Sequence, residues 1–218
     1  MKDMMRRDQE NIFSAEPDAA PKQQSKLFEH YLPGSVITPE SLENIPPQAV
    51  AALEEQSQYL VRFDNYRPGN FEKLFVISHA DASKTYVGVQ TKTYGDDGDT
   101  ERLMHLIDVG VDDQEIGHGE VRLHIDGPKK ESAYFKDKPF VGGTNTEDGS
   151  RGKGLGMRRL RMMNALTHMQ YNLPLHSDTL QSPEAKRLWE KLVAEGAAKK
   201  YREEVGKNER YMFIDVRR

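Results

Sequence analysis

The stretch Arg151-Gly152-Lys153-Gly154-Leu155-Gly156 decides the fold, because it stands between a strand candidate and a helix candidate. Lys138–Thr144 precedes it with strand character, and an apolar segment of helical period follows from Met157. A glycine-rich turn in that position leaves backbone N–H groups unpaired at the positive end of a helix dipole. Glycine also lets the backbone approach a ligand and adopt positive φ. The stretch therefore predicts an anion site suited to a phosphate or pyrophosphate.

Three phosphate-binding patterns compete for this stretch. A P-loop needs an earlier glycine and a Ser or Thr after Gly-Lys, but Glu147 and Gly154 stand at those places. The dinucleotide pattern G-x-G-x-x-G finds Met157 at its third glycine. The pattern Arg/Gln-x-x-Gly-x-Gly/Ala is matched fully by Arg151, Gly154 and Gly156. It resembles the acyl-CoA signature of the GNAT superfamily of N-acetyltransferases. The alternative is a glycine-rich loop whose basic residues are merely solvated.

The chain downstream strengthens this resemblance. Leu173–Asp178 is a short strand candidate, and Ser182 and Pro183 form a helix start as N-cap and first helical residue. The helix has one apolar face and stops at Gly196. Ala198–Glu203 and Arg210–Val216 are the last strand candidates. The order strand, signature loop, helix, strand, helix, strand, strand is similar to the C-terminal half of a GNAT protein, over about residues 135–218.

Composition limits the class of protein. The chain has 218 residues, 30% of them charged, and a formal net charge of −4. That length suits one domain with an extension, and that charge argues against a protein that mainly coats nucleic acid. The absence of cysteine rules out disulfides and thiolate metal sites and is compatible with a reducing cytoplasm. No apolar run approaches the ~20 residues that span a bilayer, and the charged N-terminus lacks the apolar region of a signal peptide. We therefore expect a cytoplasmic protein with no membrane partner.

The chain is expected to have an α+β fold, a mixed, mostly antiparallel sheet flanked by helices. Residues 1–25 are polar and predict a flexible tail, or alternatively a docking arm for a protein partner through its few apolar residues. The rest, 26–218, is interpreted as one GNAT-like domain. Its parts are a helical segment at 26–70 with a helix start at Thr38-Pro39, a strand meander at 71–150, and an acyl-CoA-binding half at 151–218. The strand candidates of the meander are Leu74–Ser78, Thr85–Thr93, Leu103–Val111, Gly119–Ile125 and Ala133–Gly142.

The resemblance implies where acetyl-CoA would bind as co-substrate, with no metal. Family members hold the pyrophosphate on the amides of the signature loop, and two splayed strands offer backbone groups to pantetheine. By that analogy the cofactor-binding residues are Val141, Gly142, Gly143, Thr144, Arg151, Gly152, Lys153, Gly154, Leu155, Gly156 and Ser182. Ser182 stands where many members have an asparagine, but it already has a structural role as helix N-cap. Lys153, Arg158 and Arg159 lie at the mouth of the loop, where they meet phosphates or form a solvated helix face.

The catalytic residues are not assigned by the sequence. Transfer of an acyl group to an amine needs a base, and Glu120, His124, His176 and Asp178 are candidates by position. Trp189 stands where the family often has a tyrosine that protonates the leaving thiolate. Indole N–H is not a usable acid, so Trp189 is interpreted as core.

Two main functions follow as expectations. The first is an N-acyltransferase that moves an acetyl group from acetyl-CoA directly to an amine of a small molecule or a protein. The second is a GNAT-fold protein without catalysis that serves as a binding or structural component, such as part of a viral (phage) particle. A nucleic-acid-modifying member of the fold would need a basic cleft, which the net charge does not indicate.

Overall fold

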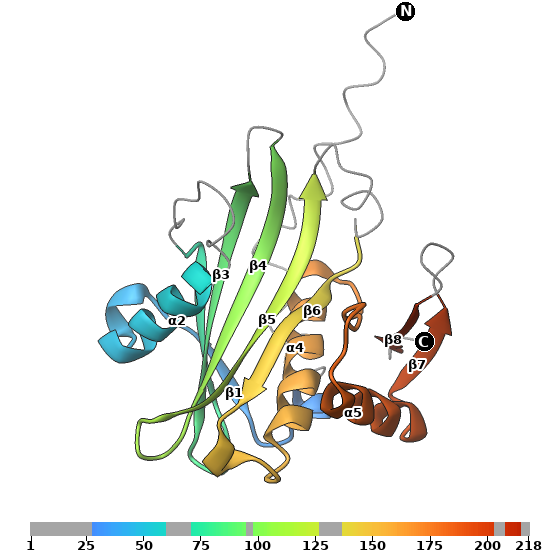
Figure 1. The fold of residues 1–218 in the computed structure, drawn as a ribbon. Coiled ribbons are helices and arrows are strands. Elements are labelled where there is room, and N and C mark those ends of the chain that lie inside the picture. The colour runs from blue at the N-terminus through green and yellow to red at the C-terminus, as the bar shows by residue number, and fades with distance from the viewer. Residues whose placement is uncertain (1–27, 60–70, 95–97, 127–136, 203–207, 215–218) are drawn as a thin grey trace, which may run out of the picture.

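The computed structural model describes residues 28–59, 71–94, 98–126, 137–202 and 208–214 (Figure 1). It confirms an α+β fold built on a mostly antiparallel sheet. In chain order the elements are β1 (Val36–Pro39), η1 (Leu42–Asn44), α2 (Pro47–Tyr59), β2 (Lys73–Ser78), β3 (Lys84–Tyr94), β4 (Asp99–Val109), β5 (Glu115–Asp126), β6 (Phe140–Thr146), η3 (Asp148–Ser150), α4 (Leu155–Tyr171), α5 (Pro183–Ala194), β7 (Ala198–Arg202) and β8 (Glu209–Phe213). The tail expected at 1–25 lies outside the described residues.

Six strands form the main sheet in their order along the chain, from β1 to β6. Each strand pairs antiparallel with the next, so the expected meander is confirmed. Tight turns make this possible. Between β2 and β3, Ala82 takes a left-handed conformation at φ 64°, and Asp81 accepts hydrogen bonds from the backbone and hydroxyl of Ser83. Such Asx turns favour chain reversal between neighbouring strands.

Both faces of the sheet carry apolar side chains, and each face has its own helical cover. On one face, Leu160 and Leu166 of α4 belong to the same buried cluster as Met104 and Val121 of the strands. On the other face, Leu53 of α2 is buried with a second cluster that includes residues of β2, β3 and β4. Figure 1 shows α4 crossing behind β5 and β6 while α2 lies at the far side of β3. The middle strands are therefore buried on both sides.

The two long C-terminal helices begin and end as their sequences predict. α5 starts at Ser182, whose Oγ accepts a hydrogen bond from Ala185 N at 3.1 Å, and Pro183 follows as the first helical residue. α4 ends at Asn172, a left-handed residue at φ 57° whose N–H bonds back to His168 O. Asn tolerates this conformation better than most residues, which makes it an effective helix stop.

The last two strands do not continue the main sheet, which corrects the expectation of one mixed sheet from residue 70 onward. β7 and β8 form a separate two-stranded ladder. A single residue, His176, connects the two ladders through a parallel bridge to Phe140 and an antiparallel bridge to Met212. The hairpin is set to one side of the main sheet in Figure 1. The strand expected at Leu173–Asp178 is thus only a bridge one residue long.

Two sequence predictions near the N-terminal half are wrong in detail. The helix start expected at Thr38-Pro39 is instead the end of β1, because an edge strand tolerates the missing N–H of proline. The strand expected at Ala133–Gly142 runs instead from Phe140 to Thr146. Its second half, Gly-Gly-Thr-Asn-Thr, has weak strand propensity, and backbone pairing with β5 overrides that propensity.

Candidate functional site

An opening between β6 and the segment around His176 is the first part of the candidate site. His176 N donates to Pro139 O at 2.8 Å, and Val141 N donates to His176 O at 3.0 Å. The next residue, Ser177, donates its N–H to Tyr211 O of β8 instead. β6 therefore shares one bridge with this segment and continues to Thr146 as the last strand of its own sheet. The two chain segments diverge after Val141, with exposed backbone on the β6 side.

A β-bulge marks the point where the opening begins. Glu120 pairs with Gly143 but Val121 pairs with Val141, so Gly142 is the extra residue of β6. A Cβ atom on Gly142 would lie 2.5 Å from Glu120 Oε1 and 2.7 Å from Arg122 Nε. Glycine is required because the two side chains occupy that space. A bulge with such a close approach re-aims the strand, and bulges are frequent beside functional sites.

The loop before α4 is the second part of the candidate site. Gly152 and Gly154 adopt left-handed conformations at φ 77° and 80°, and a Cβ on either would meet no atom within 4 Å. These two glycines are thus required by conformation and not by space. Gly154 is the N-cap of α4 and supplies no side-chain cap, which leaves the first N–H groups of the helix for a ligand or water. Residues 151–154 are exposed, so an anion can reach these groups.

Gly156 has a different role from the other two glycines. A Cβ there would lie 3.1 Å from Leu188 Cδ1 of α5. Its lack of a side chain therefore lets the first turn of α4 pack against α5. The buried side chain of Leu155 anchors the same turn in the core.

The basic residues at the start of α4 divide between two structural roles. Arg158 Nη1 donates to Asp81 Oδ2 at 2.9 Å, which ties α4 to the β2–β3 turn. Arg159 is 1% exposed, so neither phosphate contact nor a solvated helix face, the two expectations for it, describes its position. Its Nη1 donates to Thr144 Oγ1 at 2.9 Å and to Asn145 O at 2.6 Å. Lys153 stays exposed beside the loop.

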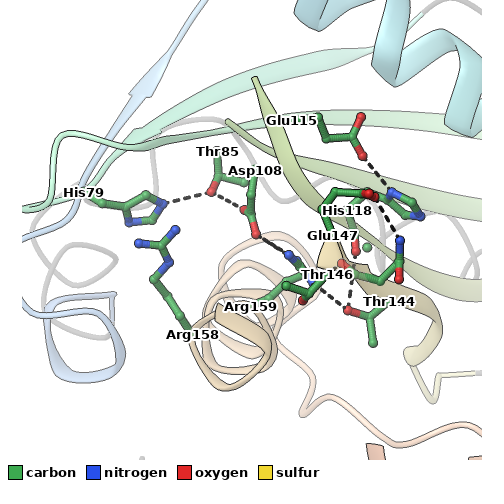
Figure 2. A network of polar contacts seen from close by, with 12 residues as sticks. His79, Thr85, Asp108, Glu115, His118, Thr144, Thr146, Glu147, Arg158 and Arg159 are labelled. Carbon is green, nitrogen blue, oxygen red and sulfur yellow. Dashed lines mark hydrogen bonds and ion pairs between the residues drawn. The ribbon is translucent and has the colours of Figure 1, made fainter. Parts of the chain in front are cut away.

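Arg159 belongs to a buried polar network that sequence reasoning did not find (Figure 2). Its partner Asp108 is fully buried in β4 and also accepts from Thr85 Oγ1 at 2.6 Å. Thr85 Oγ1 is 2.9 Å from His79 Nε2, and His79 Nδ1 is 3.0 Å from Ser35 Oγ. The signal in the sequence is a lone aspartate within the apolar run Leu106–Val109, which implies a buried cation elsewhere.

Two glycines of β5 make room for this arginine. A Cβ on Gly117 would lie 2.1 Å from Arg159 Nη2, and one on Gly119 would lie 2.1 Å from Met163 Cε and 2.8 Å from Arg159 Cδ. The spacing of these glycines, two residues apart on one strand, matches side chains of α4 that cross the same sheet face. The network therefore positions the helix start, and with it the loop at 151–154.

Glu120 is the candidate base with the most distinctive surroundings. It is 5% exposed, and its Oε1 accepts from Arg122 Nε at 2.5 Å while its Oε2 lies 3.5 Å from His105 Nδ1. Burial raises the pKa of the Glu120 carboxyl, against the opposing effect of Arg122. It stands opposite the bulge of β6. A buried carboxylate with a raised pKa in such a place fits a general base.

A chain of polar contacts joins Glu120 to the end of α2. His105 Nε2 lies 2.8 Å from Gln90 Nε2, which also donates to Ser57 Oγ at 2.8 Å. Because the amide nitrogen can only donate, His105 Nε2 accepts and its proton sits on Nδ1, toward Glu120. Lys92 Nζ donates to Ser57 O at 2.7 Å, and burial lowers its pKa to about 8.

The other three candidate bases lie in different settings. His124 lies on the same strand as Glu120, with Nε2 3.1 Å from Glu101 Oε1, and its ring stacks on Phe140. His176 is buried at the bridge, where its Nδ1 lies 2.9 Å from Tyr201 Oη, and burial lowers its pKa to about 3. Asp178 lies just beyond the bridge and caps its own turn by accepting from Thr179 N at 2.5 Å.

The two residues of α5 that the resemblance singled out have structural roles. Ser182 is the N-cap described above, so its hydroxyl oxygen already accepts a hydrogen bond. Trp189 is 2% exposed, stacked on Tyr211 and edge-on to Phe213. Its interpretation as core is confirmed.

A scan against protein-family models finds no match for this chain, and a search of curated proteins also finds none. Function is therefore argued from the site alone. Across the described part of the chain, no helix has the length and apolar character needed to cross a membrane.

Proposed function

We propose that this protein is an N-acyltransferase that moves an acetyl group from acetyl-CoA to an amine. One observation carries the proposal: the bulged, diverging end of β6 and the glycine loop at the start of α4 belong to the same strand–loop–helix unit. An extended thioester with a pyrophosphate needs both features together, a slot with free backbone groups and an anion site. The GNAT-like signature at Arg151, Gly154 and Gly156 supports the same assignment.

Binding of the acyl donor would rest on backbone groups. The first N–H groups of α4 and the left-handed Gly152 and Gly154 would receive the pyrophosphate. The exposed backbone of Gly143 and Thr144 would pair with the pantetheine arm. Val141 N–H would not take part, because it already bonds His176 O. The bound donor supplies an activated carbonyl carbon and a thiolate leaving group.

Glu120 would act as the base. A C–N bond forms as the amine attacks the thioester carbon, and the C–S bond then breaks. The amine proton passes to Glu120, directly or through one water, and the leaving sulfur takes a proton from solvent. Burial raises the pKa of Glu120 toward the working pH, which improves its match to this task. Trp189 has no part in this scheme, since it is buried and its indole is not an acid.

Calorimetry with CoA tests the binding half of the proposal. Gly154→Val forces a β-branched residue into the left-handed region at a cost of about 1–2 kcal/mol, which corresponds to roughly tenfold or more in affinity. Gly149→Val is the matched control, because that glycine is exposed, has no positive φ and faces open space. We expect CoA to bind the wild type and the control alike and the Gly154 variant weakly. Equal affinity in all three proteins contradicts the site.

A non-catalytic binding protein is the second candidate function. Trp189, in the core at the place of the usual acid, favours it. A thiol-release assay with acetyl-CoA and a panel of amines separates the two functions. Thiol release that disappears in Glu120→Gln supports the enzyme. Binding of CoA without thiol release from any amine supports the binding protein.

A further inference from the structure

Three potential metal ligands meet at the end of the sheet that leads into the glycine loop. They are Glu115 and His118 of β5 and Glu147, which directly follows β6 (Figure 2). One ligand atom from each residue lies within 4.8 Å of the others. His118 Nδ1 and Glu115 Oε1 are already 2.8 Å apart. This triad is separate from Glu120 and does not depend on the function proposed above.

A β-bulge brings the two β5 residues to one face. Asp108 pairs with Gly117 while Val109 pairs with Glu115, so Ile116 is an extra residue. Without it, side chains three residues apart on a strand would point to opposite faces. The bulge turns Glu115 toward His118.

Glu147 reaches the same place through backbone pairing. Its N–H donates to Ile116 O, the bulged residue, at 3.2 Å. Its Oε1 accepts from Asn145 Nδ2 at 3.1 Å. The carboxylate of Glu147 is therefore oriented by a neighbour on β6, as the ligands of established metal sites usually are.

We propose that Glu115, His118 and Glu147 bind a divalent first-row transition metal such as Zn²⁺ or Mn²⁺. Two carboxylates and a neutral imidazole supply two negative charges and three donor atoms of the types that these ions prefer. On binding, the metal replaces the proton shared by His118 and Glu115. Water completes the coordination, because the side chains of Glu115 and His118 are 36% and 37% exposed.

The metal would join two segments that control the glycine loop. Glu147 immediately precedes η3, which leads directly to residues 151–154. A bound ion would fix this segment to the start of β5. Because the ion binds the folded state, it would also raise the melting temperature as its concentration increases.

Isothermal calorimetry with Zn²⁺ alone, on the full chain without acyl-CoA, tests the proposal. We expect one site in the wild type and a loss of affinity of about tenfold or more in His118→Asn and in Glu147→Gln. The matched controls are Glu54→Gln, an exposed glutamate on α2, and His30→Asn, an exposed histidine. Both controls are expected to keep wild-type affinity. Unchanged affinity in His118→Asn or Glu147→Gln overturns the proposal.

A second measurement needs no variant and so does not depend on variant folding. The ¹⁵N chemical shifts of the His118 ring are followed by NMR during a Zn²⁺ titration of the wild type. A shift of one ring nitrogen that saturates at one equivalent supports coordination by His118. Ring signals of His118 that stay unchanged through the titration overturn it, whatever the calorimetry gives.

Discussion

Arg159 donates two hydrogen bonds to a single oxygen of Asp108, from Nε at 2.9 Å and from Nη2 at 2.6 Å. The second oxygen of Asp108 accepts from Thr85 Oγ1, so both oxygens of the buried carboxylate are satisfied. The remaining guanidinium nitrogen of Arg159 bonds the end of β6. One side chain thus links α4 to β4 and β6, at the point where the glycine loop meets the helix.

Breaking this pair from one side should destabilise the fold strongly. Arg159→Met leaves Asp108 buried without its cation, which costs about 3–5 kcal/mol. The exposed pair Arg187–Glu184 is the matched control, and Arg187→Met should change stability by less than about 1 kcal/mol. Urea denaturation measures both values. Equal, small effects of the two substitutions would show that Arg159 carries no special load.

Gly119 should be intolerant of any side chain. In Gly119→Ala the new methyl meets Met163 Cε and Arg159 Cδ, and Arg159 is held in place by its hydrogen bonds. Overpacking of this kind costs about 1–3 kcal/mol. Gly143→Ala is the control, since its Cβ meets no atom within 4 Å and its φ is not positive. Thermal melts of the two variants should differ clearly, and matching melting temperatures would contradict the close packing.

The sequence predicted the parts of the fold that depend on local signals. Ser182, Pro183 and Gly196 are capping residues, and they located α5 closely. Contacts between distant segments leave weaker signals. Asp108 and Arg159 are 51 residues apart, so neither residue type alone reveals the pair. The glycines of β5 carry the trace of that contact, but a glycine in a strand has several explanations.

The same limit applies to the candidate site. The glycine loop was recognisable because its chemistry lies within six consecutive residues. Glu120 could be suggested only by position, since its surroundings come from β3, β4 and α2. The bulge at Gly142 depends on the register with β5, which pairs residues beyond local sequence signals.

Trp189 should matter for stability and not for chemistry. Trp189→Ala removes a buried indole that stacks on Tyr211, and it should cost about 3–5 kcal/mol. Trp189→Phe keeps most of the apolar volume and should melt closer to the wild type. If the protein transfers acyl groups, Trp189→Phe should retain turnover in a thiol-release assay. A variant that melts normally but loses turnover a thousandfold would place the indole in the reaction.

Acid should unfold the protein through its buried histidines. Burial is the main cause that lowers the pKa of His79 to about 4, and of His105 and His176 to about 3, from the usual 6.5. The unfolded chain therefore binds protons below pH 6.5 that the folded chain refuses until its own lower pKa. Stability is full above pH 6.5 and falls below it, by about 1.4 kcal/mol per pH unit for each histidine.

Three such histidines together give a loss of about 4 kcal/mol per pH unit. That slope consumes a typical folding stability of about 5–15 kcal/mol within a few pH units. Urea denaturation between pH 7 and 5 measures the slope. NMR of the imidazole protons provides the direct check, since the signals of His79, His105 and His176 should not titrate down to pH 5. A signal from any of them with a midpoint near 6.5 contradicts its burial.

The strand order from β1 to β6 has a consequence for how the chain folds during synthesis. Every ladder of the main sheet joins consecutive strands, so each hairpin can close as soon as its second strand has left the ribosome. Loop-closure entropy stays small for such neighbouring contacts, which favours rapid formation. The segment around His176 and the final hairpin come last and attach to a sheet that already exists. We therefore expect the anion-binding end of the molecule to be assembled only when translation is nearly finished.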